Sequence, residues 1–311
     1  MKLQENVLLK NYTNYKIGGP AKLFAEVTSV TELKEVIQFA KSLAQDKIVI
    51  LGGGTKVLIN DNGFDGLIIY NKIGGILQLR SGKVNVGSGV LVGDLLKYCI
   101  ENSLSGLEWA GGLPGTIGGA VRGNAGSFGG ETKDSVVKVE SLGIEALEEK
   151  TRDNAGCEFG YRNSIFKSKN LPEFITYVTL KMVPGDKDKI RQAIQEKIDY
   201  RNIHQPMDLP SIGSTFKNIP LNSLSPELQK EFSVIVKNDP FPVIPVTKLL
   251  ALAGLKGRRV GGAMISEKHP NFIVNIDDAK AQDVEELIKI AKETIKEKYK
   301  ITLEEEIVYL N

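Results

Sequence analysis

The sequence predicts an α+β protein with more than one domain, and three observations support this. The chain has 311 residues, which is enough for two or three domains with sizeable cores. Near the N-terminus a strand, an amphipathic helix and a second strand alternate, and glycines follow the second strand directly. Further along, short strands separated by glycines indicate an antiparallel sheet, and two of the last four predicted elements are helices.

Apolar spacing assigns the individual elements. The first helix carries Leu33, Val36, Ile37 and Ala40 on one face, and Gly254 ends a later one. The predicted helices are Thr31–Leu43, Val90–Glu101, Lys189–Ile203, Thr247–Ala253 and Val284–Lys298. The predicted strands are Leu23–Val27, Lys47–Leu51, Leu67–Tyr70, Leu77–Leu79, Lys83–Val86, Val136–Leu142, Tyr177–Val183, Asn271–Ile276 and Glu306–Leu310.

Composition excludes several classes of protein. The net charge of +2 gives no field that would favour nucleic acid or an anionic membrane. Cys99 and Cys157 fit neither a metal motif nor a disulfide framework, which favours a reducing compartment, and two histidines make a catalytic metal site improbable. The N-terminus lacks a signal-peptide core, and no apolar run reaches the length of a membrane span. We expect a soluble cytoplasmic protein.

Two glycine-rich segments are the strongest candidates for ligand binding. Gly52–Lys56 follows a predicted strand, and Gly106–Glu131 is the most glycine-rich stretch of the chain. Glycine lets the main chain lie against a flat or phosphorylated ligand. Neither segment has the order of a P-loop, and no glycines have the dinucleotide-fold spacing. A pyrophosphate held between two such loops suits a long cofactor such as FAD; a run of tight turns is the alternative.

Three polar residues stand in unusual surroundings. Arg162 lies between aromatic residues, and its planar fork suits a carboxylate or an enolate, although a surface arginine stacked on Tyr161 is equally compatible. Ser214 shares a short turn with Lys217, so it is either a proton donor or an ordinary turn serine. Glu306 would share a strand face with apolar residues and be partly buried, unless it is a solvated edge charge. His269 is isolated, which is typical of a structural hydrogen-bonding histidine.

Taken together, these stretches resemble the UDP-N-acetylenolpyruvoylglucosamine reductase (UDP-N-acetylmuramate dehydrogenase) family. They occur in the family's order and span nearly the whole chain. The short spacing between Arg162 and Ser214 resembles the compact subtype without an extra substrate-covering insertion. The matching stretches are Lys16–Pro20, Leu51–Thr55, Ala110–Glu131, Phe159–Phe166, Gly213–Asn218, Gly254–Gly257, Ser266–Asn275 and Leu303–Ile307.

The resemblance implies a two-part FAD-binding domain of the vanillyl-alcohol-oxidase (PCMH) type and a smaller substrate domain. The implied boundaries are 1–70 and 71–200 for the two FAD-binding subdomains, 201–300 for the substrate domain and 301–311 for a C-terminal strand carrying Glu306. The implied reaction uses NADPH and non-covalent FAD to reduce UDP-N-acetylglucosamine enolpyruvate to UDP-N-acetylmuramate, a cell-wall (peptidoglycan) precursor. The implied protein is a monomer, and its partners are small molecules.

The resemblance also implies roles for individual residues. Ser214 would deliver the proton, while Arg162 and a protonated Glu306 would stabilise the enolate. The cofactor would lie against Gly52, Gly53, Gly54, Thr55, Lys56, Pro114, Gly115, Thr116, Gly118, Gly119, Asn124 and Ala125. The substrate would lie against Tyr161, Lys217, Asn218 and His269.

Two positions depart from the family pattern. Phe128 stands where the family usually has tyrosine, and Val243 stands where a lysine is expected to meet the diphosphate. Lys248 is a candidate replacement for that lysine. The competing interpretations are an oxidase on the same flavin fold and a flavin- or nucleotide-binding module without catalysis. Covalent attachment of flavin would need histidine or cysteine, and neither glycine segment contains one.

Overall fold

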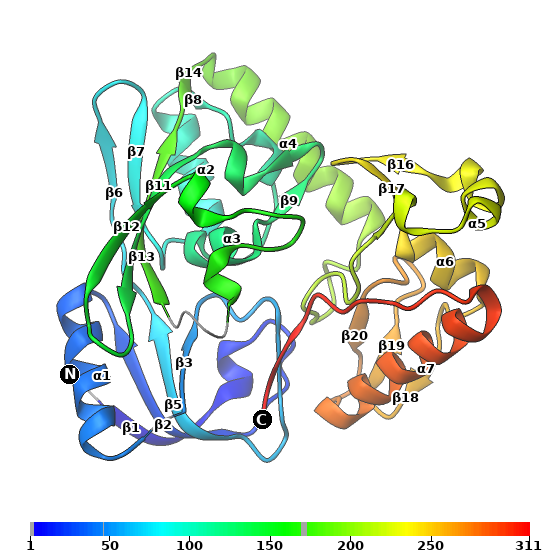
Figure 1. Ribbon diagram of the computed structural model, residues 1–311, viewed down its shortest axis with the longest axis horizontal. Helices are drawn as coiled ribbons and strands as arrows, with labels where there is room; N and C mark the ends of the chain where they lie inside the picture. The colour runs from blue at the N-terminus through cyan, green and yellow to red at the C-terminus, as the bar shows by residue number, and fades with distance from the viewer. Residues whose placement is uncertain (1–2, 46, 169–172) are drawn as a thin grey trace. The chain divides into compact units, whose positions relative to one another are not determined.

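The computed structural model describes residues 3–45, 47–168 and 173–311. The chain divides into two compact units, whose elements are labelled in Figure 1. The described parts of 1–7, 21–53 and 65–199 make up the first unit. The second unit comprises 8–20, 54–64 and 200–311, so two N-terminal segments group with the C-terminal third of the chain.

The first unit begins with a four-stranded sheet covered by one helix. Its strand order is β1-β2-β5-β3, with β3 and β5 parallel. The strands are β1 (Leu3–Leu8), β2 (Pro20–Val27), β3 (Ile48–Leu51) and β5 (Phe64–Asn71). Helix α1 (Val30–Ser42) starts where Ser29 Oγ accepts a hydrogen bond from Glu32 N. Its apolar face, including Leu33 and Ile37, packs into one core with residues of β2 and β5. The helix lies beside the strands of this sheet (Figure 1).

A five-stranded antiparallel sheet forms the rest of the first unit's core. Its order is β12-β11-β13-β7-β6, and helices α2, α3 and α4 contribute buried residues to the same core. The strands are β6 (Ile76–Leu79), β7 (Lys83–Gly87), β11 (Val136–Gly143), β12 (Glu149–Asp153) and β13 (Glu173–Lys181). The helices are α2 (Val92–Glu101), α3 (Ile117–Gly123) and α4 (Lys187–His204), which continues into the second unit.

Two-residue strands and single turns complete the first unit. The short strands pair as β8 (Leu104–Ser105) with β14 (Val183–Pro184) and as β9 (Gly126–Ser127) with β10 (Gly130–Glu131). The 3-10 turns of this unit are Glu108–Ala110, Thr132–Asp134, Ala155–Cys157 and Ile165–Lys167.

The second unit has its own core of short strands and three helices. The strands are β4 (Val57–Ile59), β15 (Ile219–Pro220), β16 (Lys237–Asn238), β17 (Pro242–Ile244), β18 (Arg259–Val260), β19 (Ala263–Ile265), β20 (Ile273–Asn275) and β21 (Val308–Leu310). The helices are α5 (Pro226–Glu231), α6 (Val246–Leu252) and α7 (Ala281–Tyr299), with 3-10 turns at Leu9–Tyr12, Leu221–Ser223 and Ser233–Ile235. One face of α7, including Val284, Leu287 and Ile288, is buried in this core.

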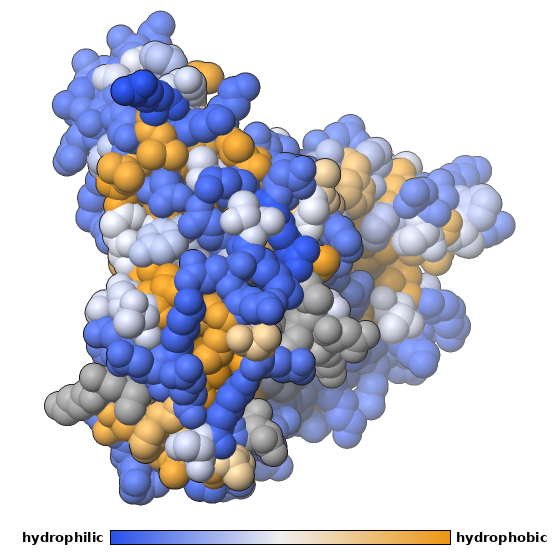
Figure 2. Space-filling model, turned by 60° about the vertical axis from the view of Figure 1, so that its left-hand side comes forward, coloured by the Kyte–Doolittle hydropathy of each residue, from blue (hydrophilic) through white to orange (hydrophobic). Residues whose placement is uncertain are grey.

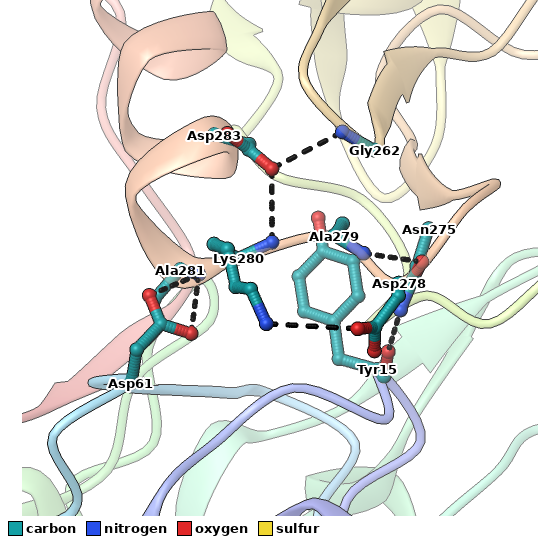
Figure 3. Close-up of polar contacts among 9 residues, drawn as sticks. All are labelled: Tyr15, Asp61, Gly262, Asn275, Asp278, Ala279, Lys280, Ala281 and Asp283. Carbon is teal, nitrogen blue, oxygen red and sulfur yellow. Dashed lines mark hydrogen bonds and ion pairs between the residues drawn. The ribbon is translucent and has the colours of Figure 1, made fainter.

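Polar contacts bind the two N-terminal segments to this core (Figure 3). The Tyr15 hydroxyl donates to the Ile273 carbonyl at 2.9 Å, and Asn275 Nδ2 donates to the Tyr15 carbonyl at 3.1 Å. Both carboxylate oxygens of Asp61 accept from the main-chain N of Ala281, the first residue of α7 (Figure 3). Strand β4 pairs in parallel with β21. Residues far apart in sequence therefore fold as one body.

Replacement of Asp61 by alanine is expected to destabilise the protein, because the carboxylate satisfies a free N–H group at the start of α7. The expected loss is about 1–2 kcal/mol, which lowers the melting temperature by about 2–6 °C. The change in melting temperature is measured by thermal unfolding monitored with circular dichroism. Asp61→Asn retains an acceptor and is the matched control. Equal melting temperatures for Asp61→Ala and the wild type would contradict the capping role.

The structure confirms all five predicted helices. It differs from the predicted secondary structure at three other places. The segment from Gly106 to Glu131 contains helix α3, so it is not loop throughout. Strand β21 starts at Val308, which leaves Glu306 before the strand and overturns its predicted place in an alternating pattern. The strand predicted to end at Val183 is divided into β13 and β14. The functional assignment of the predicted domains stays a prediction.

The face drawn in Figure 2 is largely hydrophilic, and hydrophobic residues appear there as separate patches. Such scattered exposure is normal for a folded protein. Within residues 3–45, 47–168 and 173–311, no helix combines the length and the apolar character needed to cross a membrane.

Candidate active site

The two predicted cofactor segments meet within the first unit. Gly52 and Gly53 follow β3, while Gly115 and Thr116 precede α3. A Cβ on Gly52 would lie 2.6 Å from Thr116 Oγ1, and one on Gly53 would lie 2.7 Å from Gly115 Cα. A side chain at Gly53 would therefore push the two main chains apart, and one at Gly52 would collide with the Thr116 side chain. The contact explains why glycine is needed at both positions, and main chain without side chains is what close approach to a flat or phosphorylated cofactor requires.

Helix α3 begins beside this contact. Thr116 Oγ1 accepts a hydrogen bond from Gly119 N at 3.3 Å, which caps the helix. Gly118 is needed for packing, because its Cβ would lie 2.9 Å from that of Ser88. Gly119 is exposed, and its Cβ would meet only Thr116 Oγ1 at an ordinary 3.5 Å. The absence of a side chain at Gly119 is therefore not required by the protein's own packing and leaves the main chain accessible to a ligand.

The remaining predicted cofactor residues differ in their surroundings. Asn124 is fully buried; its amide donates to the Gly160 carbonyl and accepts from Lys133 N, so its side chain connects loops of the protein itself. Ala125 also makes main-chain hydrogen bonds, while Pro114 is exposed. Gly54, Thr55 and Lys56 belong to the second unit, so the predicted Gly52–Lys56 loop crosses the division between the units. Direct contact of any of these residues with a cofactor stays a prediction.

Arg162 belongs to the first unit and sits in a tight turn. Its φ of +54° is left-handed, and Gly160 and Asn163 exchange main-chain hydrogen bonds around it. Nη2 donates to the Gly126 carbonyl at 2.7 Å, and the guanidinium carbon lies 5.2 Å from the centre of the Tyr161 ring. The stacking on Tyr161 is therefore present. The group is half-buried and rigidly directed, which is compatible with a further role in binding an anion.

Ser214 and Glu306 come together within the second unit through main-chain pairing. Thr215 N donates to the Asn271 carbonyl at 2.7 Å, and Glu306 N donates to the Thr215 carbonyl at 2.8 Å. The segment that carries Ser214 is thus held between the segments of Asn271 and Glu306. Ser214 and Glu306 are 92 positions apart in the sequence. The side chain of Glu306 is only 14% exposed, against 71% for Glu304, so the expected partial burial is confirmed despite the corrected strand boundary.

Lys56 joins this arrangement. Its ammonium donates to the Ser214 carbonyl at 2.7 Å and lies 3.3 Å from Glu306 Oε1. Sequence reasoning placed Lys56 with the cofactor and did not associate it with Ser214 or Glu306. No local signal could have done so, because the contact depends on the parallel pairing of β4 with β21.

The three predicted substrate residues of the second unit already have structural partners. Lys217 forms an ion pair with Glu304, and Asn218 Oδ1 accepts from Val246 N at the start of α6. His269 contacts Phe272 edge-on, and burial lowers the pKa of its imidazole to about 4. Among the described residues, its buried Nδ1 has no hydrogen-bond partner. His269 is therefore neutral near pH 7.

Both departures from the family pattern have a structural context. Phe128 occupies the turn between β9 and β10, and Lys197 Nζ lies 5.6 Å from the centre of its ring. Val243 is fully buried in β17, so this position does not present a side chain to solvent. Lys248 is exposed on α6. Among the residues that the structure describes, there is no cluster of metal-ligating side chains.

Comparison with known families now defines the class of protein. Residues 21–142 match the family "FAD binding domain". The matched range includes both glycine segments and helix α3. The protein is accordingly an FAD-dependent flavoprotein. Residues 205–310 match the family "UDP-N-acetylenolpyruvoylglucosamine reductase, C-terminal domain", which covers Ser214 and Glu306.

Whole-chain relatives identify the family. The chain is 36% identical over 309 residues to the UDP-N-acetylenolpyruvoylglucosamine reductase of Bacillus subtilis, covering 98% of this chain and 93% of the relative. It is 38% identical over 300 residues to that of Carboxydothermus hydrogenoformans, covering 96% and 91%. The crystal structure of the Thermus caldophilus reductase is similar over both complete chains, with a TM-score of 0.77 and 32% identity. The chain belongs to the UDP-N-acetylenolpyruvoylglucosamine reductase family.

Proposed function

We propose that this protein reduces UDP-N-acetylglucosamine enolpyruvate to UDP-N-acetylmuramate, with NADPH as the electron donor and in the cytoplasm. Its family membership supports the reaction class. The observation that carries the proposal is the pairing of the Ser214 segment with Glu306 inside the second unit, because these residues come from distant parts of the chain. Reduction of the vinyl ether needs a hydride and a proton, and the pairing brings the segment of a hydroxyl residue and the segment of an acidic residue together within the second unit.

Each residue has a distinct task in the proposal. The main chain at Gly52, Gly53 and the start of α3 would hold FAD, and when bound this group would supply the hydride chemistry between NADPH and the vinyl carbon. Hydride addition leaves negative charge on the adjacent carbon and its carboxylate. Arg162 and the protonated form of Glu306 stabilise that charge, and the Ser214 hydroxyl then protonates the carbon. The substrate gains one hydride, which leaves NADPH as NADP⁺, and one proton, which Ser214 recovers from solvent, so the reaction balances.

An anaerobic titration tests the proposal. The purified protein is expected to be yellow, to lose its flavin absorbance on addition of NADPH, and to recover it on addition of the enolpyruvyl sugar. Mass spectrometry of the product should show a gain of two hydrogen atoms. Reduced protein that the sugar does not re-oxidise would refute the proposed substrate. Oxygen consumption with an alcohol or hydroxy acid in the absence of NADPH would instead support an oxidase.

Replacement of Lys248 by alanine is expected to raise the KM for the UDP-sugar by about three- to tenfold, the effect of one partly solvated contact with a charged group. The reason is that Val243 is buried and leaves the diphosphate without the family's lysine, while Lys248 is exposed nearby in sequence. Steady-state kinetics measures this, with Lys289→Ala as a surface control. An unchanged KM would remove Lys248 from the substrate site.

A further inference from the structure

The ammonium group of Lys56 connects two residues of the proposed site at once. It donates a hydrogen bond to the main-chain carbonyl of Ser214 at 2.7 Å and lies 3.3 Å from the Glu306 carboxyl oxygen. All three residues belong to the second unit. An ammonium has three donors and no acceptor, so it can donate to a main-chain carbonyl and to a carboxyl oxygen at the same time.

The main chain of Lys56 is hydrogen-bonded to the segment that contains Glu306. Val308 N donates to the Lys56 carbonyl at 2.8 Å, and the pairing of β4 with β21 continues from this bond. Lys56 thus reaches Ser214 and Glu306 from a fixed backbone position. Gly213 has a left-handed φ of +76°, and a Cβ there would lie at an ordinary contact distance of 3.6 Å from Lys56 Nζ, so the ammonium lies directly beside this turn.

Burial makes the two contacts significant. The Lys56 side chain is 36% exposed and that of Glu306 is 14% exposed, so water competes only in part for the contact between the ammonium and the carboxyl oxygen. A hydrogen bond from an ammonium to a carbonyl is stronger than one between neutral groups. Loss of the ammonium would release the turn before Thr215 and the Glu306 carboxyl together.

We propose that Lys56 is a positioning residue for proton delivery: it fixes the main chain of Ser214 and the carboxyl of Glu306 relative to each other. This inference rests on the proposed function and deepens it. It also moves Lys56 from the cofactor-binding role implied by the sequence resemblance to the proton-delivery side of the site. Lys56 acts through Ser214 and Glu306, so it should affect only the step in which the substrate is reduced.

Separate measurement of the two half-reactions in holoprotein tests the inference. In Lys56→Met, reduction of the flavin by NADPH is expected to stay within about twofold of wild type. Re-oxidation by the enolpyruvyl sugar is expected to slow by about 10- to 150-fold, the effect of losing one hydrogen bond from a charged group. The apparent Kd of the sugar should change by less than about threefold. Lys56→Arg, which retains the charge, should recover at least about fivefold.

Lys292→Met is the matched control, because Lys292 is a similarly exposed lysine whose ammonium lies 2.7 Å from the neighbouring Glu305. It should behave as wild type in both half-reactions. Wild-type re-oxidation in Lys56→Met, equal slowing of both half-reactions, loss of flavin from a folded variant, or no recovery in Lys56→Arg would each overturn the inference. If Lys56→Met does not fold, Lys56→Gln replaces it in the same comparison. Failure of the sugar to re-oxidise the wild type would overturn the proposed function itself.

Discussion

The Ser214→Ala variant is expected to accept electrons from NADPH at the wild-type rate and to fail in passing them to the enolpyruvyl sugar. Removal of the hydroxyl takes away the proposed proton donor and leaves the turn intact, because the neighbouring Thr215 and Glu306 are held by main-chain hydrogen bonds. Loss of a positioned general acid slows a reaction by about 10²- to 10⁴-fold. Anaerobic stopped-flow measurement of the flavin absorbance follows the two half-reactions separately.

Ser211→Ala is the control for this experiment, because it removes a hydroxyl from the same connecting segment. The Ser211→Ala variant is expected to behave as wild type in both half-reactions. Full-speed re-oxidation of Ser214→Ala by the sugar would show that another group delivers the proton. In that case the adjacent Glu306 would be the next residue to replace.

The Gly53→Val variant is expected to be purified largely without flavin. Its Cβ would lie 2.7 Å from the Cα of Gly115, and neither group belongs to a flexible side chain. The two segments would have to separate, which deforms the main chain proposed to hold the cofactor. Overpacking of this kind costs about 1–3 kcal/mol, which corresponds to a loss of about 5- to 150-fold in FAD affinity. Flavin content per protein and titration of the apoprotein with FAD measure the effect.

Gly123→Ala is the matched control from the same segment. A Cβ there meets nothing within 4 Å, and the residue lies in α3. Alanine favours a helix over glycine by about 1 kcal/mol, so this variant should keep its flavin and its stability. A fully loaded, yellow Gly53→Val protein would show that contact between the two glycine segments is not what holds the cofactor.

Local patterns were sufficient for most elements of secondary structure. The apolar face of α1 is visible as 3.6-residue periodicity and is buried as predicted, and the buried face of α7 has the same periodicity. Patterns were insufficient where tertiary contacts decide the conformation. Helix α3 has three glycines among its seven residues, so its helical state depends on the cap at Thr116 and on packing rather than on propensity.

In the candidate site, too, some features are predictable from the sequence and others depend on tertiary contacts. The types of its residues are evident from short motifs, and a serine, an arginine and a glutamate in such contexts suggest proton transfer and stabilisation of negative charge. The partners of these residues are not evident. Lys56 lies 158 positions from Ser214, and Asn218 uses its side-chain oxygen on the main chain of Val246. Contacts of this range depend on which strands pair.

The order of the residues along the chain is enough to establish an α+β flavoprotein, its two glycine segments and its family, because backbone freedom, amphipathic spacing and motif order are local properties. Folding in three dimensions determined that two N-terminal segments complete the C-terminal unit and that the ammonium of Lys56 binds Ser214 and Glu306. The physical reason is that core burial of Tyr15 and Leu58, together with strand pairing, selects among distant partners that no local spacing distinguishes.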